Sequence, residues 1–186
     1  GVNMFFFPTK ASGFKVTYSL LIRKFFTFFT RWKWKSYYHT VSADLGYCGK
    51  NMSLCNGIWF GGAERIFIDD NVFIGDNVIL NASKGGKIDI GKQVAIGSNS
   101  TFLTWTYGNF NNTKIVRSEA KKEIIFNNIF IAAGVDIGYN VTINPGVHLS
   151  EGCIVNSGAV VSGKFPANSI LSGVPAIIVG VRLSTG

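Results

Sequence analysis

The sequence has few cysteines and no long apolar run, and each shortage argues against a class of protein. Cys48, Cys55 and Cys153 form neither a CxxC pair nor a dense framework, so we expect free thiols in a reducing compartment. No uncharged apolar run reaches about 18 residues, which argues against a transmembrane helix. The opening GVNMFFFPTKASGFK lacks the ordered charged, apolar and small-residue regions of a secretion signal. We therefore expect a cytoplasmic location.

Acidic residues are scarce in the first fifty positions, and this shortage concentrates the net charge there. The 186 residues include 18 Lys and Arg against 10 Asp and Glu, a formal net charge of +8. Residues 1–50 hold eight of the basic residues and one acid, Asp44, which gives +7 for this segment and leaves +1 for residues 51–186. We therefore expect a basic, aromatic-rich segment over 1–50, a nearly neutral body over 51–180 and a tail over 181–186.

The basic segment contains an amphipathic helical pattern over residues 19–38. Apolar residues recur there at helical spacing with basic residues around them: Leu21, Phe25, Phe28, Phe29 and Trp32, then Arg23, Lys24, Arg31, Lys33 and Lys35. Two interpretations are open, because such a helix can pack on the body or a neighbouring subunit, or lie on the anionic inner face of a membrane. Nucleic acid is not expected, since no known binding module surrounds these bases.

A six-residue repeat dominates the body. Aliphatic residues recur six apart from residue 125, and a second small aliphatic position follows four residues after each of the first six: Ile125, Ile131, Ile137, Ile143, Leu149, Val155 and Val161, then Ile129, Val135, Val141, Val147, Cys153 and Ala159. Two earlier stretches follow the same spacing: Ile68, Ile74 and Leu80, then Ile90, Ile96 and Phe102. Gly, Asn, Ser and Asp lie between them and tolerate the positive φ of tight corners. The repeat predicts an all-β solenoid of short parallel strands with aliphatic side chains inside.

The repeat from about Asp69 to Gly180 resembles that of the bacterial hexapeptide-repeat acyltransferases. The ending VVSGKFPANSILSGVPAIIVG, residues 160–180, is similar to the family's closing segment with its Pro-containing turn and GxPA element. The resemblance implies a left-handed parallel β-helix, a homotrimer, and acetyl-CoA bound between subunits as the acyl donor, with no metal. The sugar O-acetyltransferase branch is the most similar, because its members carry a long loop where this chain has residues 103–124.

The resemblance implies transfer of an acetyl group to a sugar hydroxyl, for example on a surface polysaccharide or a lipid-linked precursor. Such transfer needs a base for the acceptor's proton, a donor for the thioester oxyanion and contacts that hold coenzyme A. The family's loop normally presents a histidine at about Trp105 or Tyr107, and residues 103–124 contain none. An alternative is therefore open: a degenerate trimer that serves as a scaffold or binding protein without acyl transfer. Transfer to an amine also stays open.

His148 is the candidate base, with Tyr107 as a second candidate catalytic residue that could hydrogen-bond the acceptor. His148 lies 18 residues, one coil, after Phe130, so the two side chains should stack on one outer face. A phenol is a poor base at neutral pH, which favours the imidazole. Trp105, Asn109 and Phe130 are candidate acceptor contacts, although Trp105 could instead pack against a neighbouring subunit.

The resemblance also implies a set of contacts to acetyl-CoA. Backbone amides at Ala132, Ala133 and Gly134, and at Ser157 and Gly158, match positions that hold the pantetheine arm in relatives. Ser162 matches a threonine that contacts coenzyme A, and the cations Lys164 and Arg182 are shifted relative to the family pattern. Pro175 and Ala176 keep the adenine-side turn.

Overall fold

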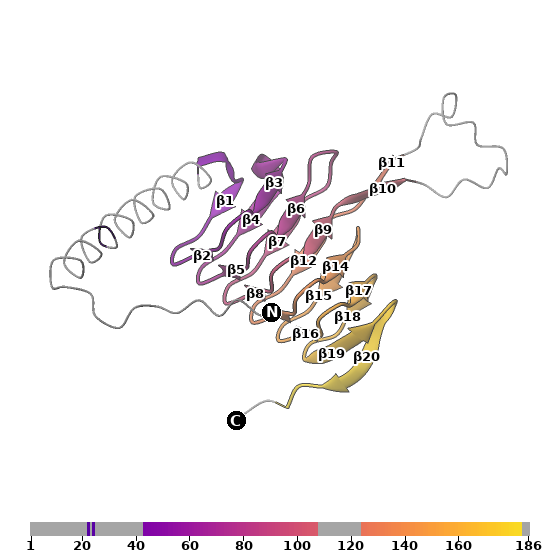
Figure 1. Ribbon diagram of the computed structural model, residues 1–186. Coiled ribbons are helices and arrows are strands. Elements are labelled where there is room, and N and C mark those ends of the chain that lie inside the picture. Colours follow the sequence, from indigo (N-terminus) through magenta and orange to yellow (C-terminus); the bar gives the residue numbers. More distant parts are fainter. Residues whose placement is uncertain (1–21, 23, 25–42, 108–123, 184–186) are drawn as a thin grey trace, which may run out of the picture. The chain divides into compact units, whose positions relative to one another are not determined.

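The computed structural model describes residues 22, 24, 43–107 and 124–183 (Figure 1). The chain divides into two units, Gly1–Ala43 and Asp44–Gly186, which are described separately. In the first unit, Ile22 and Lys24 are helical, and the rest of the predicted helix over 19–38 lies outside the described residues. Within the described ranges, no helix is both long enough and apolar enough to cross a membrane.

The second unit is a solenoid of short parallel strands in three sheets (Figure 1). Sheet A contains β1 (Tyr47–Cys48), β4 (Ile66–Ile68), β7 (Ile88–Ile90), β12 (Ile129–Ile131), β15 (His148–Leu149) and β18 (Lys164–Phe165). Sheet B contains β2 (Ser53–Leu54), β5 (Phe73–Ile74), β8 (Ala95–Ile96), β13 (Asp136–Ile137), β16 (Ile154–Val155), β19 (Ser169–Gly173) and the antiparallel β20 (Ala176–Val181). Sheet C contains β3 (Trp59–Gly61), β6 (Ile79–Asn81), β9 (Thr101–Leu103), β14 (Thr142–Ile143) and β17 (Val160–Val161). The chain thus follows the order A, B, C through successive coils, which confirms the predicted all-β solenoid.

The repeat positions form the core, with one exception. The side chains of Ile68, Leu80 and Phe102 are fully buried, as are those of Ile131 and Ile143. Ile125 was predicted to be the first residue of the later run, and this prediction is wrong because its side chain is 41% exposed. It lies in β11 (Ile124–Phe126), which pairs antiparallel with β10 (Trp105–Tyr107) outside the coil. The buried repeat resumes at Ile129 instead.

The corners leading from sheet A to sheet B and from sheet B to sheet C each contain a residue in the left-handed region. These residues have φ between 55° and 77°: Asn51, Asn71, Gln93, Gly134, Gly152 and Asn168 at the A–B corners, and Gly57, Asn77, Asn99, Asn140 and Gly158 at the B–C corners. Asparagine and glycine adopt this conformation at low cost, which explains their spacing in the sequence. Side-chain amides also hydrogen-bond between coils, as from Asn77 Nδ2 to Asn99 Oδ1 at 3.3 Å.

The corners leading from sheet C back to sheet A are irregular, and the long loop leaves the solenoid at one of them. The Thr104 hydroxyl is buried there and donates to the carbonyl oxygens of Asn81 and Gly85. The Asn127 amide donates to the Thr104 carbonyl oxygen at 2.9 Å and closes the base of the loop. The described part of the loop is therefore a two-stranded arm, β10–β11, that returns to the coil directly before β12.

Candidate functional site

Six outward-facing residues of sheet A lie in register and form one row across the coils. The row is Tyr47, Phe67, Asp89, Phe130, His148 and Lys164. Neighbouring strands are about 4.8 Å apart, so successive residues of the row project side by side from adjacent strands. The row places aromatic, acidic, imidazole and ammonium groups on one face of the solenoid, and we call it the sheet A row.

His148 stacks on Phe130 within this row. Their ring centroids are 4.7 Å apart and their ring planes are inclined by 31°. The imidazole is half-buried, whereas Phe130 is 41% exposed. The predicted stacking of these two residues is therefore confirmed, and Lys164 follows His148 directly in the row.

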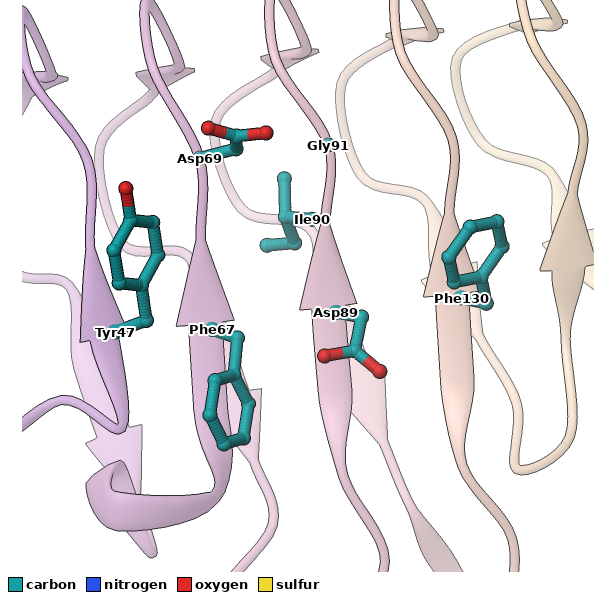
Figure 2. A pocket seen from close by; sticks show the side chains of 7 residues that line it. All are labelled: Tyr47, Phe67, Asp69, Asp89, Ile90, Gly91 and Phe130. Atoms are coloured by element: carbon teal, nitrogen blue, oxygen red, sulfur yellow. The ribbon is translucent and has the colours of Figure 1, made fainter.

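A groove lies in front of the sheet A row in the first four coils (Figure 2). It has a volume of about 470 Å³ and is lined by Tyr47, Phe67, Asp69, Asp89, Ile90, Gly91 and Phe130. The side chain of Asp89 lies on the strand between those of Phe67 and Phe130 (Figure 2). The Lys87 ammonium nitrogen lies 5.2 Å from the centroid of the Phe67 ring. Sequence reasoning missed Phe67 and Asp89, although Asp89 occupies the same outward position between two core isoleucines as Phe130 does.

The arm carries the two aromatic residues that stand near the family's usual histidine position. Trp105 and Tyr107 make an edge-to-face contact with ring centroids 5.6 Å apart and planes at 84°. Tyr107 is 46% exposed, while the buried indole nitrogen of Trp105 has no hydrogen-bond partner among the residues that the structure describes. Asn109, the third loop candidate, lies outside the described residues.

The candidate acetyl-CoA contacts are spread over different corners of the coil. Residues 132–134 follow sheet A, residues 157–158 follow sheet B, and Ser162 follows sheet C. A coil of three sheets has three separate corners, and sheet C does not reach the A–B corner. The coil of one chain therefore does not bring these groups together. A Cβ atom built on Gly134 or Gly158 would meet nothing within 4 Å. Both backbones therefore leave room for the close approach of a narrow chain such as a pantetheine arm.

Several of these candidates already have protein partners. The Asn144 side-chain amide donates to the Ser162 hydroxyl at 2.8 Å. The Arg182 guanidinium forms an ion pair with the Asp136 carboxylate at 3.0 Å and also contacts the Gly134 carbonyl oxygen at 3.4 Å. Both charged side chains are partly exposed, so the pair stabilises the fold by only about 0–1 kcal/mol and is easily exchanged for another partner.

The remaining candidates are Ser157, which hydrogen-bonds to Tyr139, and Pro175 and Ala176, which lie in the hairpin of β19 and β20. The Ser157 hydroxyl oxygen accepts a hydrogen bond from the Tyr139 amide at 3.0 Å. Pro175 follows a cis peptide bond in the turn between β19 and β20, and Ala176 beside it is 8% exposed. In the described part of the chain, no group of three or more His, Cys, Asp and Glu side chains could hold a metal ion.

Known proteins have similar sequences and folds, although no family model matches the chain. The chain is 29% identical over 122 residues to WbbJ of Escherichia coli (strain K12), which is named as a lipopolysaccharide biosynthesis O-acetyl transferase; the match covers 63% of this chain and 61% of WbbJ. The fold matches a hexapeptide-repeat acetyltransferase of Vibrio cholerae complexed with acetyl coenzyme A, with a TM-score of 0.69, 29% identity, and coverage of 79% of this chain and 76% of that one. The chain thus resembles the hexapeptide-repeat acyltransferases in both sequence and fold. Coils of opposite hand would not superpose to this extent, so the solenoid has the same hand as the Vibrio cholerae acetyltransferase.

A second relative matches a shorter part of the chain. The chain is 30% identical over 93 residues to YvoF of Bacillus subtilis (strain 168), named as an acetyltransferase, and the match covers 50% of this chain and 47% of YvoF. The chain therefore aligns with less than two thirds of the length of both WbbJ and YvoF.

Proposed function

We propose that this hexapeptide-repeat protein is an O-acetyltransferase that moves an acetyl group from acetyl-CoA to a sugar hydroxyl. The observation that carries the proposal is the stacked pair of His148 and Phe130 on the outer face of sheet A. Phe130 lies in β12, the strand that directly follows the arm, and His148 lies in β15, the next strand of sheet A. The similarity to an acetyltransferase complexed with acetyl coenzyme A supports the same donor here.

His148 acts as the general base in this proposal. It accepts the proton of the acceptor hydroxyl as the hydroxyl oxygen forms its bond to the acetyl carbon. The carbon–sulfur bond of the thioester breaks, and the proton passes from the imidazole to the departing thiolate. Phe130 holds one face of the imidazole, which restricts its orientation before the acceptor binds.

We infer that the enzyme works as a homotrimer, because the donor contacts cannot all come from one chain. Gly134 lies at an A–B corner and Gly158 at a B–C corner, and both are open to approach. Two adjacent subunits can place these corners on opposite sides of one cleft. The Lys164 ammonium, next to His148 in the sheet A row, then supplies positive charge for the donor's phosphates or for the oxyanion.

A non-catalytic trimer is the second candidate function, and two features of the chain favour it. Residues 103–124 contain no histidine, and Arg182 is already paired with Asp136. A protein of this kind would retain the cleft but transfer no acetyl group.

Transfer of isotope-labelled acetyl groups from acetyl-CoA to a panel of methyl pyranosides separates the two functions. We expect product with the wild-type protein and a decrease in kcat of about 100-fold or more with His148→Ala, the usual contribution of a general base. His39→Ala is the matched control, because His39 is the other histidine of the chain. Transfer by His148→Ala at the wild-type rate would rule out the proposed base, and absence of acetyl-CoA binding by the wild type would rule out the enzyme.

A more specific proposal concerns the acceptor and the location. The name of WbbJ and the basic segment over 19–38 support a surface polysaccharide or lipid-linked acceptor, used by a cytoplasmic enzyme held at the inner membrane face. Sedimentation with vesicles of anionic phospholipid at low salt checks this, and a variant with Lys33→Gln and Lys35→Gln should bind more weakly. Wild-type protein that stays in the supernatant would contradict the membrane contact.

A further inference from the structure

We propose that the groove on sheet A is the acceptor subsite and that Asp89 makes it select a neutral pyranoside over an acidic one. The inference rests on the proposed acetyl transfer and adds the side chains that choose the acceptor. The groove, with its volume of about 470 Å³, falls within the range of small-molecule sites. It also adjoins the proposed base, since Phe130 lines the groove and stacks on His148.

The carboxylate of Asp89 is the central polar group of this groove. Asp89 is half-buried, and within the described part of the chain its side chain has no hydrogen bond or ion pair. By contrast, the nearby Asp69 carboxylate accepts a hydrogen bond from the Asp70 amide at 2.8 Å. An ionised carboxylate can only accept hydrogen bonds, so the free oxygens of Asp89 fit the hydroxyl donors of a sugar.

The aromatic rings beside Asp89 supply the apolar surface that a sugar ring needs. Phe67 and Phe130 lie on the two strands that flank Asp89, and Phe130 is 41% exposed (Figure 2). The carbon–hydrogen face of a pyranoside can cover such a ring while its edge hydroxyls reach the carboxylate. His148 lies one strand, about 4.8 Å, beyond Phe130, so a sugar on Phe130 presents an edge to the imidazole.

The charges around the groove explain the choice of a neutral ring. Asp69 and Asp89 contribute two carboxylates, and the Lys87 ammonium over Phe67 offsets only one of them. A uronate carboxylate placed between these groups would be repelled, because like charges at a few ångströms raise the free energy of binding. A neutral hexoside meets no such repulsion.

Binding of methyl glucoside and of the corresponding methyl glucuronoside, titrated by ligand-observed NMR, tests the proposal without requiring turnover. We expect the wild type to bind the neutral glycoside at least about tenfold more tightly than the uronate. Asp89→Asn should weaken binding of the neutral glycoside by about tenfold, the value of a lost hydrogen bond to a charged group, and should also narrow the preference. If Asp89 has a purely structural role, Asp89→Asn will leave the ratio of the affinities for the neutral glycoside and the uronate unchanged. An unchanged ratio therefore overturns the proposal.

Matched variants separate the groove from other surfaces. Phe67→Ala should weaken glycoside binding, whereas Phe73→Ala should not, because Phe73 is an exposed phenylalanine on sheet B. Glu151→Gln, which removes a carboxylate outside the groove, should leave both affinities unchanged. The proposal would also be overturned if the wild type binds no glycoside and Asp89→Asn changes the oligomeric mass. That pair of results would show that a second copy of the chain covers the groove.

The subsite and the activity fail in distinguishable ways. If acetyl transfer occurs but Asp89→Asn leaves the preference unchanged, the subsite is wrong and the transferase stands. If neutral glycosides bind through Asp89 but no acetyl-CoA is bound or consumed, the subsite stands and the transferase is wrong.

Discussion

The imidazole ring of His148 lies against the phenyl ring of Phe130, with 4.7 Å between their centroids and 31° between their planes. This contact results from the repeat, because one full coil separates the two residues and places them in register on adjacent strands. The same register places Asp89 on the other side of Phe130. A regular coil thus brings a carboxylate, an aromatic platform and a base into one row.

Removal of the aromatic platform should impair catalysis. Phe130→Ala is expected to lower kcat/KM for acetyl transfer by about tenfold or more, because it removes an aromatic contact to the imidazole and apolar surface for the acceptor. The measurement is steady-state kinetics with the pyranoside that the wild type acetylates best. Phe73→Ala, the exposed phenylalanine of sheet B, should keep wild-type kinetics, and equal losses in both variants would contradict a specific role for Phe130.

The position where the repeat resumes can be tested through stability. Ile143→Ala removes a fully buried side chain and should lower the free energy of unfolding by about 2–5 kcal/mol. Ile125→Ala removes a side chain that is 41% exposed on the arm and should change it by only about 0.5 kcal/mol. Urea denaturation of the two variants gives the comparison. A large loss in Ile125→Ala would place Ile125 inside the coil.

The coil was predictable because its signals are local. Aliphatic residues at a six-residue spacing and Asn or Gly at the corners each appear in a single short segment, and adjacent segments repeat them. Ile125 misled the prediction because it matches the spacing by coincidence, and only its antiparallel pairing with Thr106 shows that it belongs to the arm. Pairing between segments on either side of a long loop leaves no periodic signal in the sequence.

One corner residue departs from the pattern and offers a stabilising substitution. Gln93 has φ of 59°, at a corner position where other coils have Asn or Gly. Gln93→Gly should raise the free energy of unfolding by about 1 kcal/mol, because a left-handed conformation is costly for a residue with a Cβ atom. Lys92→Gly should instead lower it by about 0.5–1 kcal/mol through backbone entropy. Thermal unfolding of both variants checks the pair, and stabilisation by both or by neither would contradict this reasoning.

Cys153 should make stability depend on pH in the alkaline range. Burial raises the pKa of its thiol above the ordinary value of 9.0, although hydrogen bonds with the Ser169 and Ser150 backbones act in the opposite direction. The folded state therefore resists ionisation of the thiol. Its contribution to stability is fully present below pH 9 and is lost as the pH rises from 9 through the folded-state pKa.

Comparison with Cys153→Ala isolates this effect. The substitution should lower stability at pH 7 and should also flatten its decline above pH 9, as measured by chemical denaturation at several pH values. An equally steep decline in the variant would show that other groups cause it. Asp136→Asn, which removes an exposed ion pair with Arg182, should leave the alkaline decline unchanged.

The candidate site was predictable only in part. The pairing of His148 with Phe130 follows from spacing alone, whereas the roles of Phe67 and Asp89 depend on the groove that four separate coils build together. Nothing in the local sequence distinguishes Asp89 from the many polar residues at other outward positions. The candidate contacts to acetyl-CoA show the same limit, because residues 132–134 and 157–158 lie at different corners of the coil.

The most direct test of the account is transfer of labelled acetyl from acetyl-CoA to a neutral methyl pyranoside, measured side by side for the wild type, His148→Ala and His39→Ala. We expect labelled ester with the wild type and with His39→Ala, and a rate lower by about 100-fold or more with His148→Ala. Labelled ester formed at equal rates by all three proteins, or by none of them, would contradict it.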